Sequence, residues 1–346
     1  MKILHTADLH LKKDKPEQLD ILRWIIDTSN SRDVDHVIIA GDMFESDADA
    51  STLRSEVKKI FENAKASILI IPGNHDARAY NTDYDYGSRV DQITDTPFSI
   101  LEKGGFRFVA VPFQDRSFSE CIKNIPEDTD ILIAHGTLYD PSFIFSVIDD
   151  IETKYMPIFP KNIENRARYV ALGHLHSRFN ITTYARTKAV YPGSPYALDT
   201  KCASPRAVAL VTITDHDIKI ERVDVDIAAY WDEKDFFVFP GNEDRVIEGI
   251  RQHLKAADPR RIQPHISIRG YISHGDKEYK RTIDTIETHF KPMFKDLLLD
   301  VSIESWDTLV QHRMVQRFIE KTRFLEEPVR MKLYEITFPI LSKALQ

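Results

Sequence analysis

The chain begins with MKILHTADLH, residues 1–10. The apolar run over residues 2–5 predicts a buried β-strand, and Asp8 and His10 follow at the point where that strand ends. A buried strand requires neither of these two side chains. In α/β folds, binding and catalytic residues gather beyond the carboxyl ends of the strands. The opening stretch therefore predicts a strand that leads into a site.

Four more apolar runs are followed by loops whose side chains can bind a metal ion. Taken one at a time, each loop is more typical of ordinary surface polarity than of a metal site. Five strand ends of this kind together predict that their side chains converge. The five stretches are Asp8-Leu9-His10, Gly41-Asp42-Met43-Phe44-Glu45, Gly73-Asn74-His75-Asp76, His135-Gly136 and Gly173-His174-Leu175-His176.

Seven side chains in these stretches are candidate metal ligands, and they combine carboxylate, imidazole and amide groups. This mixture suits Mn²⁺, Fe²⁺ or Zn²⁺ better than Ca²⁺, and the lack of cysteine among them argues against a purely structural zinc site. Seven ligands exceed the needs of one ion, so we expect two ions, each with four protein ligands if Asp42 bridges them. The candidates are Asp8, His10, Asp42, Asn74, His135, His174 and His176.

The composition is that of an ordinary globular protein. The chain has 346 residues, of which 42% are hydrophobic and 29% are charged, and its net charge is −8. That charge argues mildly against nonspecific coating of nucleic acid, although the acidic excess lies within residues 1–226, where cations would bind. No apolar run approaches the ~20 residues of a membrane span, and we see no signal peptide. Cys121 and Cys202 fit no ligand pattern, which favours a reducing, cytoplasmic location.

The order of the expected elements divides the chain into three parts. Over residues 1–226, β-rich runs alternate with helical patterns, which predicts an α/β domain with a mixed sheet or two packed sheets flanked by helices. Residues 227–304 read strand, helix, strand, helix, strand, with the second helix expected from about Asp276 to Phe290. This order is typical of a small α+β domain. Residues 305–346 predict two helices separated near residues 327–328. Two roles are possible for this tail: a helical hairpin that packs on its own chain, and a surface that docks a partner.

The five stretches resemble, in the same order, the motifs DxH, GDxxE, GNHD, a lone His-Gly and GHxH of the calcineurin-like metallophosphoesterases. The resemblance covers residues 1–225 and implies that family's fold, a mixed two-sheet sandwich flanked by helices. Within the superfamily, LHTADLH, AGDMFE, PGNHD, GHLH and YPGSP (residues 191–195) resemble the DNA double-strand-break repair exonucleases of SbcD type, the meiotic recombination eleven nuclease family. A small α+β capping domain and a helical tail are similar to that family's layout too.

The resemblance also implies roles for individual residues. One ion would be held by Asp8, His10, Asp42 and His176, and the other by Asp42, Asn74, His135 and His174. His75 matches the family's catalytic histidine, which faces the scissile phosphate without binding metal. Glu45 stands where other members have histidine or an acid, and an acid there is expected to orient His75 and raise its pKa.

Three further residues near the motifs are expected to have structural or surface roles. His5 precedes DxH and is expected to face the interior. Asp76 ends GNHD and is expected to fix its loop rather than bind metal. Arg206 is one of several basic residues near the motifs that could contact phosphate, and a solvated surface position is the simpler alternative.

The resemblance implies an enzyme, a two-metal-dependent DNA nuclease that acts in double-strand-break repair. It would cut duplex ends from 3′ to 5′ as an exonuclease and single strands as an endonuclease, with two divalent ions, Mn²⁺ by preference. Its partners would be DNA, an SbcC-type coiled-coil ABC ATPase docked at the tail, and a second copy of itself in a homodimer. It would be cytoplasmic, and associated with the nucleoid when it acts on DNA. Two alternatives stay open: a metallophosphoesterase for a small phosphodiester or phosphomonoester, and a DNA-bridging scaffold with a vestigial site.

Overall fold

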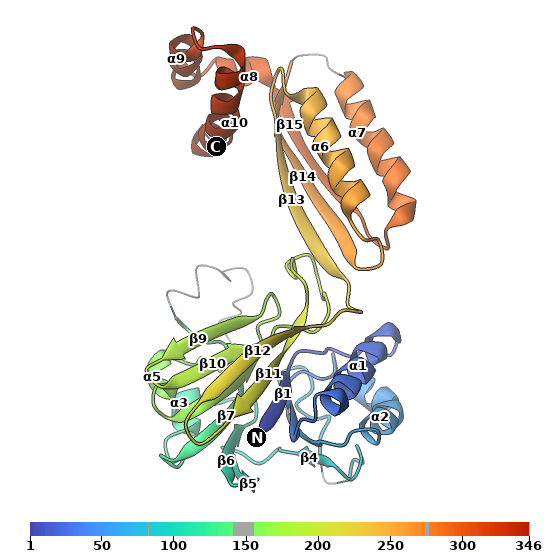
Figure 1. The fold of residues 1–346 in the computed structure, drawn as a ribbon, viewed down its shortest axis with the longest axis vertical. Helices are drawn as coiled ribbons and strands as arrows, with labels where there is room; N and C mark the ends of the chain where they lie inside the picture. Colours follow the sequence, from blue (N-terminus) through green and yellow to red (C-terminus); the bar gives the residue numbers. More distant parts are fainter. Residues whose placement is uncertain (82, 141–155, 274–276, 346) are drawn as a thin grey trace. The chain divides into compact units, whose positions relative to one another are not determined.

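The computed structural model describes residues 1–81, 83–140, 156–273 and 277–345 (Figure 1). The chain divides into two compact units, Met1–Tyr230 and Trp231–Gln346. Each unit has hydrophobic clusters of its own.

The first sheet of the N-terminal unit is mixed. Its four strands β1 to β4 run parallel, whereas β11 pairs antiparallel with β1 and β12 pairs antiparallel with β11. Helices α1 (Glu17–Ser31) and α2 (Asp47–Phe61) connect the first three strands and pack on one face of the sheet. In spatial order the strands are β12 (Ile218–Asp224), β11 (Ala207–Ile213), β1 (Lys2–Thr6), β2 (His36–Ala40), β3 (Ser67–Ile71) and β4 (Val90–Gln92).

The second sheet is also mixed. Strands β6, β7, β8 and β10 run parallel, and the antiparallel strands β5 and β9 form its two edges. Two short helices, α3 (Phe118–Cys121) and α5 (Pro160–Ile163), lie in its outer layer. In spatial order the strands are β5 (Ser99–Lys103), β6 (Phe106–Val111), β7 (Thr129–His135), β8 (Ala167–Gly173), β10 (Thr187–Tyr191) and β9 (Asn180–Tyr184).

The two sheets pack face to face because their central strands are apolar on both sides. In β2, Val37 and Ile39 lie in the cluster under the helices, whereas Ile38 and Ala40 lie in the cluster between the sheets. This alternation follows from the period of two along a strand. The predicted α/β fold, a mixed two-sheet sandwich flanked by helices, is confirmed.

The C-terminal unit contains a three-stranded sheet with helices on both faces. On one face, α6 and α7 lie side by side (Figure 1) and bury the apolar side chains of the sheet. On the other face, α8, α9 and α10 enclose a smaller aromatic cluster around Phe239 and Phe338. The elements are β13 (Tyr230–Val238), α6 (Glu243–Ala256), β14 (Ile262–Ile272), α7 (Lys277–Phe290), β15 (Leu298–Ser305), α8 (Trp306–Val310), α9 (Arg313–Thr322) and α10 (Glu327–Leu345).

The elements differ from the sequence-based expectations in two places. Strands β4 and β5 are short and half-buried, so they have too little apolar periodicity to be seen in the sequence. The first of the two expected tail helices is broken at Gln311 and His312 into α8 and α9. The start of α7 that we expected at Asp276 lies outside the described residues. Among the described helices, none is long and apolar enough to cross a membrane.

His5 faces the second sheet from β1, as expected. Its side chain is fully buried, and its Nδ1 lies 2.8 Å from the hydroxyl of Tyr169 in β8. Burial lowers the pKa of His5 to about 3, and the backbone of Leu172 offsets this only in part. The folded chain therefore holds His5 neutral.

Replacing His5 should flatten part of the acid dependence of stability. The imidazole of His5 has a pKa near 6.5 in the unfolded chain, so below that pH it binds a proton in the unfolded state but not in the folded state. The free energy of unfolding therefore falls by up to ~1.4 kcal/mol per pH unit as the pH is lowered to about 3. In His5→Gln this contribution is absent. Urea unfolding of both chains in EDTA between pH 7.5 and 5 measures the difference, and parallel pH profiles would contradict a buried neutral His5.

Candidate metal centre

The five predicted stretches meet at the carboxyl ends of parallel strands from both sheets. Strands β1, β2 and β3 of the first sheet lead into Asp8, Asp42 and Asn74, and β7 and β8 of the second sheet lead into His135 and His174. The backbone is strained here, because four candidate ligands have positive φ: Asp8 (56°), His10 (43°), Asp42 (50°) and His174 (106°). Strain of this kind, in residues other than glycine, tends to gather at functional sites.

Backbone pairing holds the two acidic loops against each other. The N–H of Asp8 donates to the carbonyl of Gly41 (3.1 Å), and the N–H of His10 donates to the carbonyl of Asp42 (3.0 Å). Gly41 has φ +91°, and a Cβ at this position would lie 2.2 Å from Nδ1 of His135. A side chain there would displace a candidate ligand, so the close approach requires glycine.

A first cluster brings together Asp8, His10, Asp42 and His176. Their potential ligand atoms all lie within 4.8 Å of one another. Nε2 of His10 is 3.2 Å from Nε2 of His176 and 3.7 Å from Oδ2 of Asp42. Nε2 of His176 is 3.8 Å from Oδ1 of Asp8. These four residues are the set that the family resemblance implies for one ion.

A second cluster contains Asp42 again, with His135 and His174. Nε2 of His135 lies 3.2 Å from Oδ2 of Asp42 and 3.1 Å from Oδ1 of Asn74. Nδ1 of His174 lies 3.2 Å from the same Asn74 oxygen. The structure thus brings all seven candidate ligands together, with Asp42 common to both clusters.

The chemistry of the donor atoms fits two cations. Nδ1 of His135 faces the carbonyl of Ala40 (2.9 Å), which can only accept, so in the neutral ring Nε2 has a lone pair aimed at two oxygens. Oδ2 of Asp42 is buried and makes no hydrogen bond. Facing donor atoms of this kind need a cation between them, and two ligands bound at ~2.1 Å are about 3 to 3.4 Å apart, as several pairs are here. The residues therefore fit a pair of divalent ions.

Burial and charge shift the pKa values of the ligands in opposite directions. Burial raises the pKa of Asp8 to about 7 and lowers that of His174 to about 3. Burial also opposes protonation of His135, but the charge of Asp42, whose Oδ2 lies 3.2 Å from Nε2 of His135, outweighs this effect and raises the pKa to about 9. A proton therefore occupies the His135–Asp42 pair at neutral pH in the ion-free chain, and a cation that binds there has to displace it.

The carboxylate of Glu45 faces His10. Its Oε2 lies 2.9 Å from Nδ1 of His10, and this hydrogen bond lowers the pKa of Glu45 to about 2. The carboxylate therefore orients His10 and leaves Nε2 as the ligand atom, an arrangement typical of histidines that bind metal. Glu45 contacts His75 through its backbone carbonyl instead, 3.2 Å from Nδ1.

His75 lies beside both clusters. The backbone N–H of His75 donates to Oδ1 of Asp42 (2.9 Å), and its ring packs edge-on against the ring of His10 with centroids 4.7 Å apart. Because the Glu45 carbonyl can only accept, Nδ1 of His75 is the protonated nitrogen, and Nε2 is left for a substrate. The side chain is exposed, as a residue that meets a substrate should be.

Two residues hold the loops in ways that the sequence suggested only in part. Asp76 is fully buried and accepts from the backbone N–H of Gly73, Met43 and Phe44, so it fixes the loop as expected. Arg206 is also buried, at 1% exposure, and donates to backbone carbonyls. It therefore cannot contact phosphate, and no pattern in the sequence marked it as internal.

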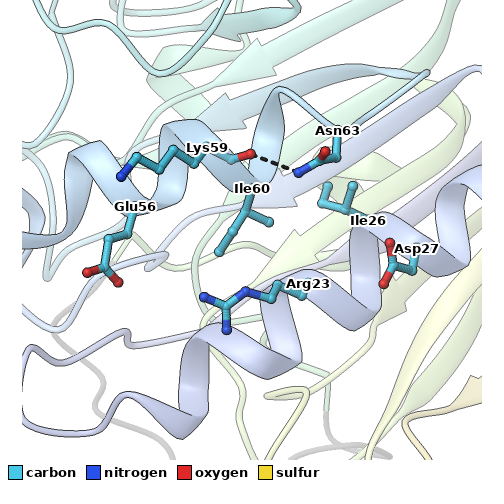
Figure 2. Close-up of a pocket in the computed structure, with 7 residues that line it drawn as sticks. All are labelled: Arg23, Ile26, Asp27, Glu56, Lys59, Ile60 and Asn63. Carbon is cyan, nitrogen blue, oxygen red and sulfur yellow. Dashed lines mark hydrogen bonds between the residues drawn. The ribbon is translucent and has the colours of Figure 1, made fainter.

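A separate hollow lies between α1 and α2 on the outer side of the first sheet. Figure 2 shows its walls, with Arg23 and Asp27 from α1 and Glu56 and Lys59 from α2. Its volume is about 490 Å³. None of the seven candidate ligands lines it, and side chains of both charges surround it. The convergent strand ends are therefore the better candidate for a site of chemistry.

The family model of the calcineurin-like phosphoesterases matches residues 1–178, which is more than half of the chain and contains all seven ligands. The chain belongs to the calcineurin-like phosphoesterase family. The predicted enzyme class, a phosphoester hydrolase that uses metal ions, follows from this membership. The family resemblance drawn from the five motifs is thereby confirmed.

This calcineurin-like phosphoesterase is also similar to a named nuclease. It is 24% identical over 277 residues to the SbcD component of the nuclease SbcCD of Escherichia coli (strain K12), covering 66% of this chain and 69% of the relative. Among solved structures, it resembles an archaeal phosphodiesterase (19% identity, TM-score 0.37, 64% of this chain and 100% of the other). It also resembles a dimetal phosphatase from Danio rerio (9% identity, TM-score 0.42, 64% and 95%).

Removing the Glu45 carboxylate should loosen His10 and weaken metal binding. We expect Glu45→Ala to lower the affinity for one ion about 10- to 100-fold, and Glu45→Gln to lower it less, because an amide oxygen can still accept from Nδ1 of His10. Equilibrium dialysis against Mn²⁺ with metal analysis measures this. Lys12→Ala is the control, since Lys12 lies 3.4 Å from the other carboxylate oxygen and touches neither cluster. Equal affinity in all four chains would contradict the role given to Glu45.

Proposed function

We propose that this protein is a two-metal DNA nuclease that hydrolyses phosphodiester bonds in double-strand-break repair. The observation that carries the proposal is the pair of ligand clusters that share Asp42, with His75 beside them. Two divalent cations held there would neutralise the phosphate, activate a water molecule and stabilise the leaving oxygen. The ligand set supports this chemistry, because only Asp8 and Asp42 are formally charged and two ions would keep a net positive charge.

The residues of the chain would bind and orient the reacting groups. The backbone N–H of His75 donates to the carboxylate of Asp42, and Nδ1 of its ring faces the carbonyl of Glu45, so the ring is oriented while Nε2 stays available. In the imidazolium form the ring would carry a second proton on Nε2, and from that position it would stabilise the transition state or give this proton to the leaving oxygen. The hydrogen bond from His10 to Glu45 would keep His10 in the tautomer that binds metal.

DNA is the proposed substrate for two reasons. The similarity to the SbcD component of nuclease SbcCD covers 66% of the chain, and the C-terminal unit provides a further folded region. A small phosphodiester or phosphomonoester is the alternative substrate, since the chemistry of the site is the same. A DNA-bridging scaffold with a vestigial site is disfavoured, because all seven ligands and His75 are in place.

Several finer parts of the proposal come from the resemblance alone. They are the 3′ to 5′ direction, endonuclease activity on single strands, Mn²⁺ as the preferred ion, a homodimer, and action in the cytoplasm at the nucleoid. The division of residues 227–346 into a capping domain that contacts DNA and a docking tail belongs to the same proposal.

Helix α10 supports docking of a coiled-coil ATPase of SbcC type. Val329, Ile336 and Ile340 lie seven and four residues apart, so they share one side of the helix, and their exposures are 54%, 60% and 63%. A shallow apolar hollow adjoins them, lined in part by Pro328 and Leu333. A stripe with this spacing matches the apolar seam of a coiled-coil helix.

Cleavage of labelled duplex DNA with Mn²⁺ tests the function. We expect the wild type to shorten the duplex and His75→Ala to lose activity by about 100-fold or more, because a general acid or transition-state donor is missing. The variant should keep its two ions, since His75 does not complete either four-ligand set. Metal analysis of both chains checks this expectation.

Hydrolysis of bis-p-nitrophenyl phosphate in the same samples separates the rivals. Turnover of this small ester without any cleavage of DNA would favour a small-substrate phosphoesterase. Loss of an ion in His75→Ala would make His75 a ligand and overturn the role proposed for it.

A charge on the apolar side of α10 should disrupt docking. We expect Ile336→Asp to weaken binding of the coiled-coil segment of the SbcC-type ATPase from the same genome by about 10-fold or more, while DNA cleavage stays unchanged. Ile227→Asp is the matched control, because Ile227 is also exposed (49%) but lies in the N-terminal unit. Titration by fluorescence anisotropy measures both, and equal affinities would exclude this side of α10 from the interface.

A further inference from the structure

The segment Tyr191-Pro192-Gly193-Ser194-Pro195-Tyr196 lies beside both clusters without supplying a ligand. It begins at the last residue of β10 and has a tyrosine at each end. Residues 191–195 are buried, and Tyr196 packs against the cluster under the helices. The proposed nuclease chemistry assigns no role to this segment.

Tyr196 supports the loop that contains His10. Its hydroxyl donates to the backbone carbonyls of Leu9 and His10, the latter at 3.1 Å. Nε2 of Gln18 donates to the same hydroxyl (2.6 Å), and Oε1 of Gln18 accepts from the N–H of Lys12 (2.7 Å). The strained backbone of His10 is therefore held by its own N–H and by its carbonyl. A ring anchored in this way has little freedom to move its Nε2.

Tyr191 supports the loop that follows His135. Its hydroxyl donates to the carbonyl of Gly136 (2.6 Å) and accepts from the N–H of Leu138 (2.9 Å). Tyr191 is 2% exposed, so water cannot replace these bonds. Each tyrosine hydroxyl thus fixes the backbone beside one candidate ligand: Tyr196 beside His10 of the first cluster, and Tyr191 beside His135 of the second.

The middle of the segment holds the other histidine of the first cluster. The N–H of Ser194 donates to the carbonyl of His176 (3.1 Å), and the guanidinium of Arg206 donates to the same carbonyl (2.5 Å). Gly193 has φ +73°, and a Cβ there would lie 2.9 Å from Nη2 of Arg206 and 3.0 Å from that carbonyl. Glycine is therefore needed for the arginine to reach His176.

We propose that residues 191–196 position the ligands of both clusters. Tyr196 would set the metal affinity of the first cluster, and Tyr191 would set that of the second. The inference rests on the proposed metal binding but not on the substrate. Each hydroxyl fixes the backbone within three residues of one ligand, and ligand atoms displaced by a fraction of an ångström bind an ion less well. Loss of one hydroxyl should therefore weaken one ion and spare the other.

The test measures Mn²⁺ bound at equilibrium in chains with only one intact cluster. His176→Ala removes a ligand of the first cluster, and His174→Ala removes a ligand of the second. In the His176→Ala chain, we expect added Tyr191→Phe to weaken the remaining ion about 10-fold or more. Added Tyr196→Phe should change it by less than about twofold. In the His174→Ala chain the two effects should be exchanged.

Two results would overturn the inference. One is equal weakening of the remaining ion by both tyrosine variants, which would mean general destabilisation, and the other is wild-type affinity in both. Gln18→Leu is a second variant that tests the role of Tyr196, because it removes a partner of the Tyr196 hydroxyl and leaves the tyrosine ring in place. It should weaken the same ion as Tyr196→Phe. Circular dichroism in EDTA shows that each chain is folded before metal is added.

The outcome separates this inference from the proposed nuclease. If the exchange of effects is found but DNA is not cut, the positioning role stands and the nuclease proposal falls. If the wild type binds no Mn²⁺ at any concentration tested, the metal centre and the positioning role fall together.

Discussion

The carboxylate of Asp42 is the constraint on which the site depends. Its Oδ1 accepts from the N–H of His75, and its Oδ2 lies near imidazole nitrogens of both clusters without a hydrogen bond of its own. Burial disfavours the charged form, but His135 and His10 outweigh burial and hold the pKa of Asp42 below its usual range. A buried carboxylate of this kind is stable only with positive charge beside it, so the surrounding histidines and the expected cations are parts of one electrostatic unit.

The strained backbone around Asp42 has a structural explanation. Positive φ at Asp8, His10, Asp42 and His174 costs about 1 to 3 kcal/mol at each residue. Hydrogen bonds between the first two loops, the side chain of Asp76 and the hydroxyl of Tyr196 hold these conformations in place. The surrounding structure is regular and well packed, which offsets the strain at the loops. A network of supporting residues thus keeps the ligands in position before any ion arrives.

The sequence predicted the sandwich fold and the residues that converge, because both follow from local patterns. Apolar runs mark the strands, and the polar residue after each run marks the strand end. It could not predict contacts that depend on the tertiary path. The Glu45 carboxylate reaches His10 rather than His75, and Arg206 is buried under the His176 loop, although both side chains are charged and would be expected in water. The break between α8 and α9 was missed for a similar reason, since Gln311 and His312 carry no helix-breaking signal.

The ligands are divided between the two sheets of the sandwich. Asp8, His10, Asp42 and Asn74 come from the first sheet, whereas His135, His174 and His176 come from the second. An ion bound to either cluster would therefore act as a cross-link between two layers, in addition to their apolar packing and polar contacts such as that of His5 with Tyr169. Because such a cross-link exists only when the layers are correctly aligned, occupancy of the centre would report on the assembly of the whole N-terminal unit. Mutations far from the loops, at the interface between the sheets, would then act on catalysis through the alignment of the layers.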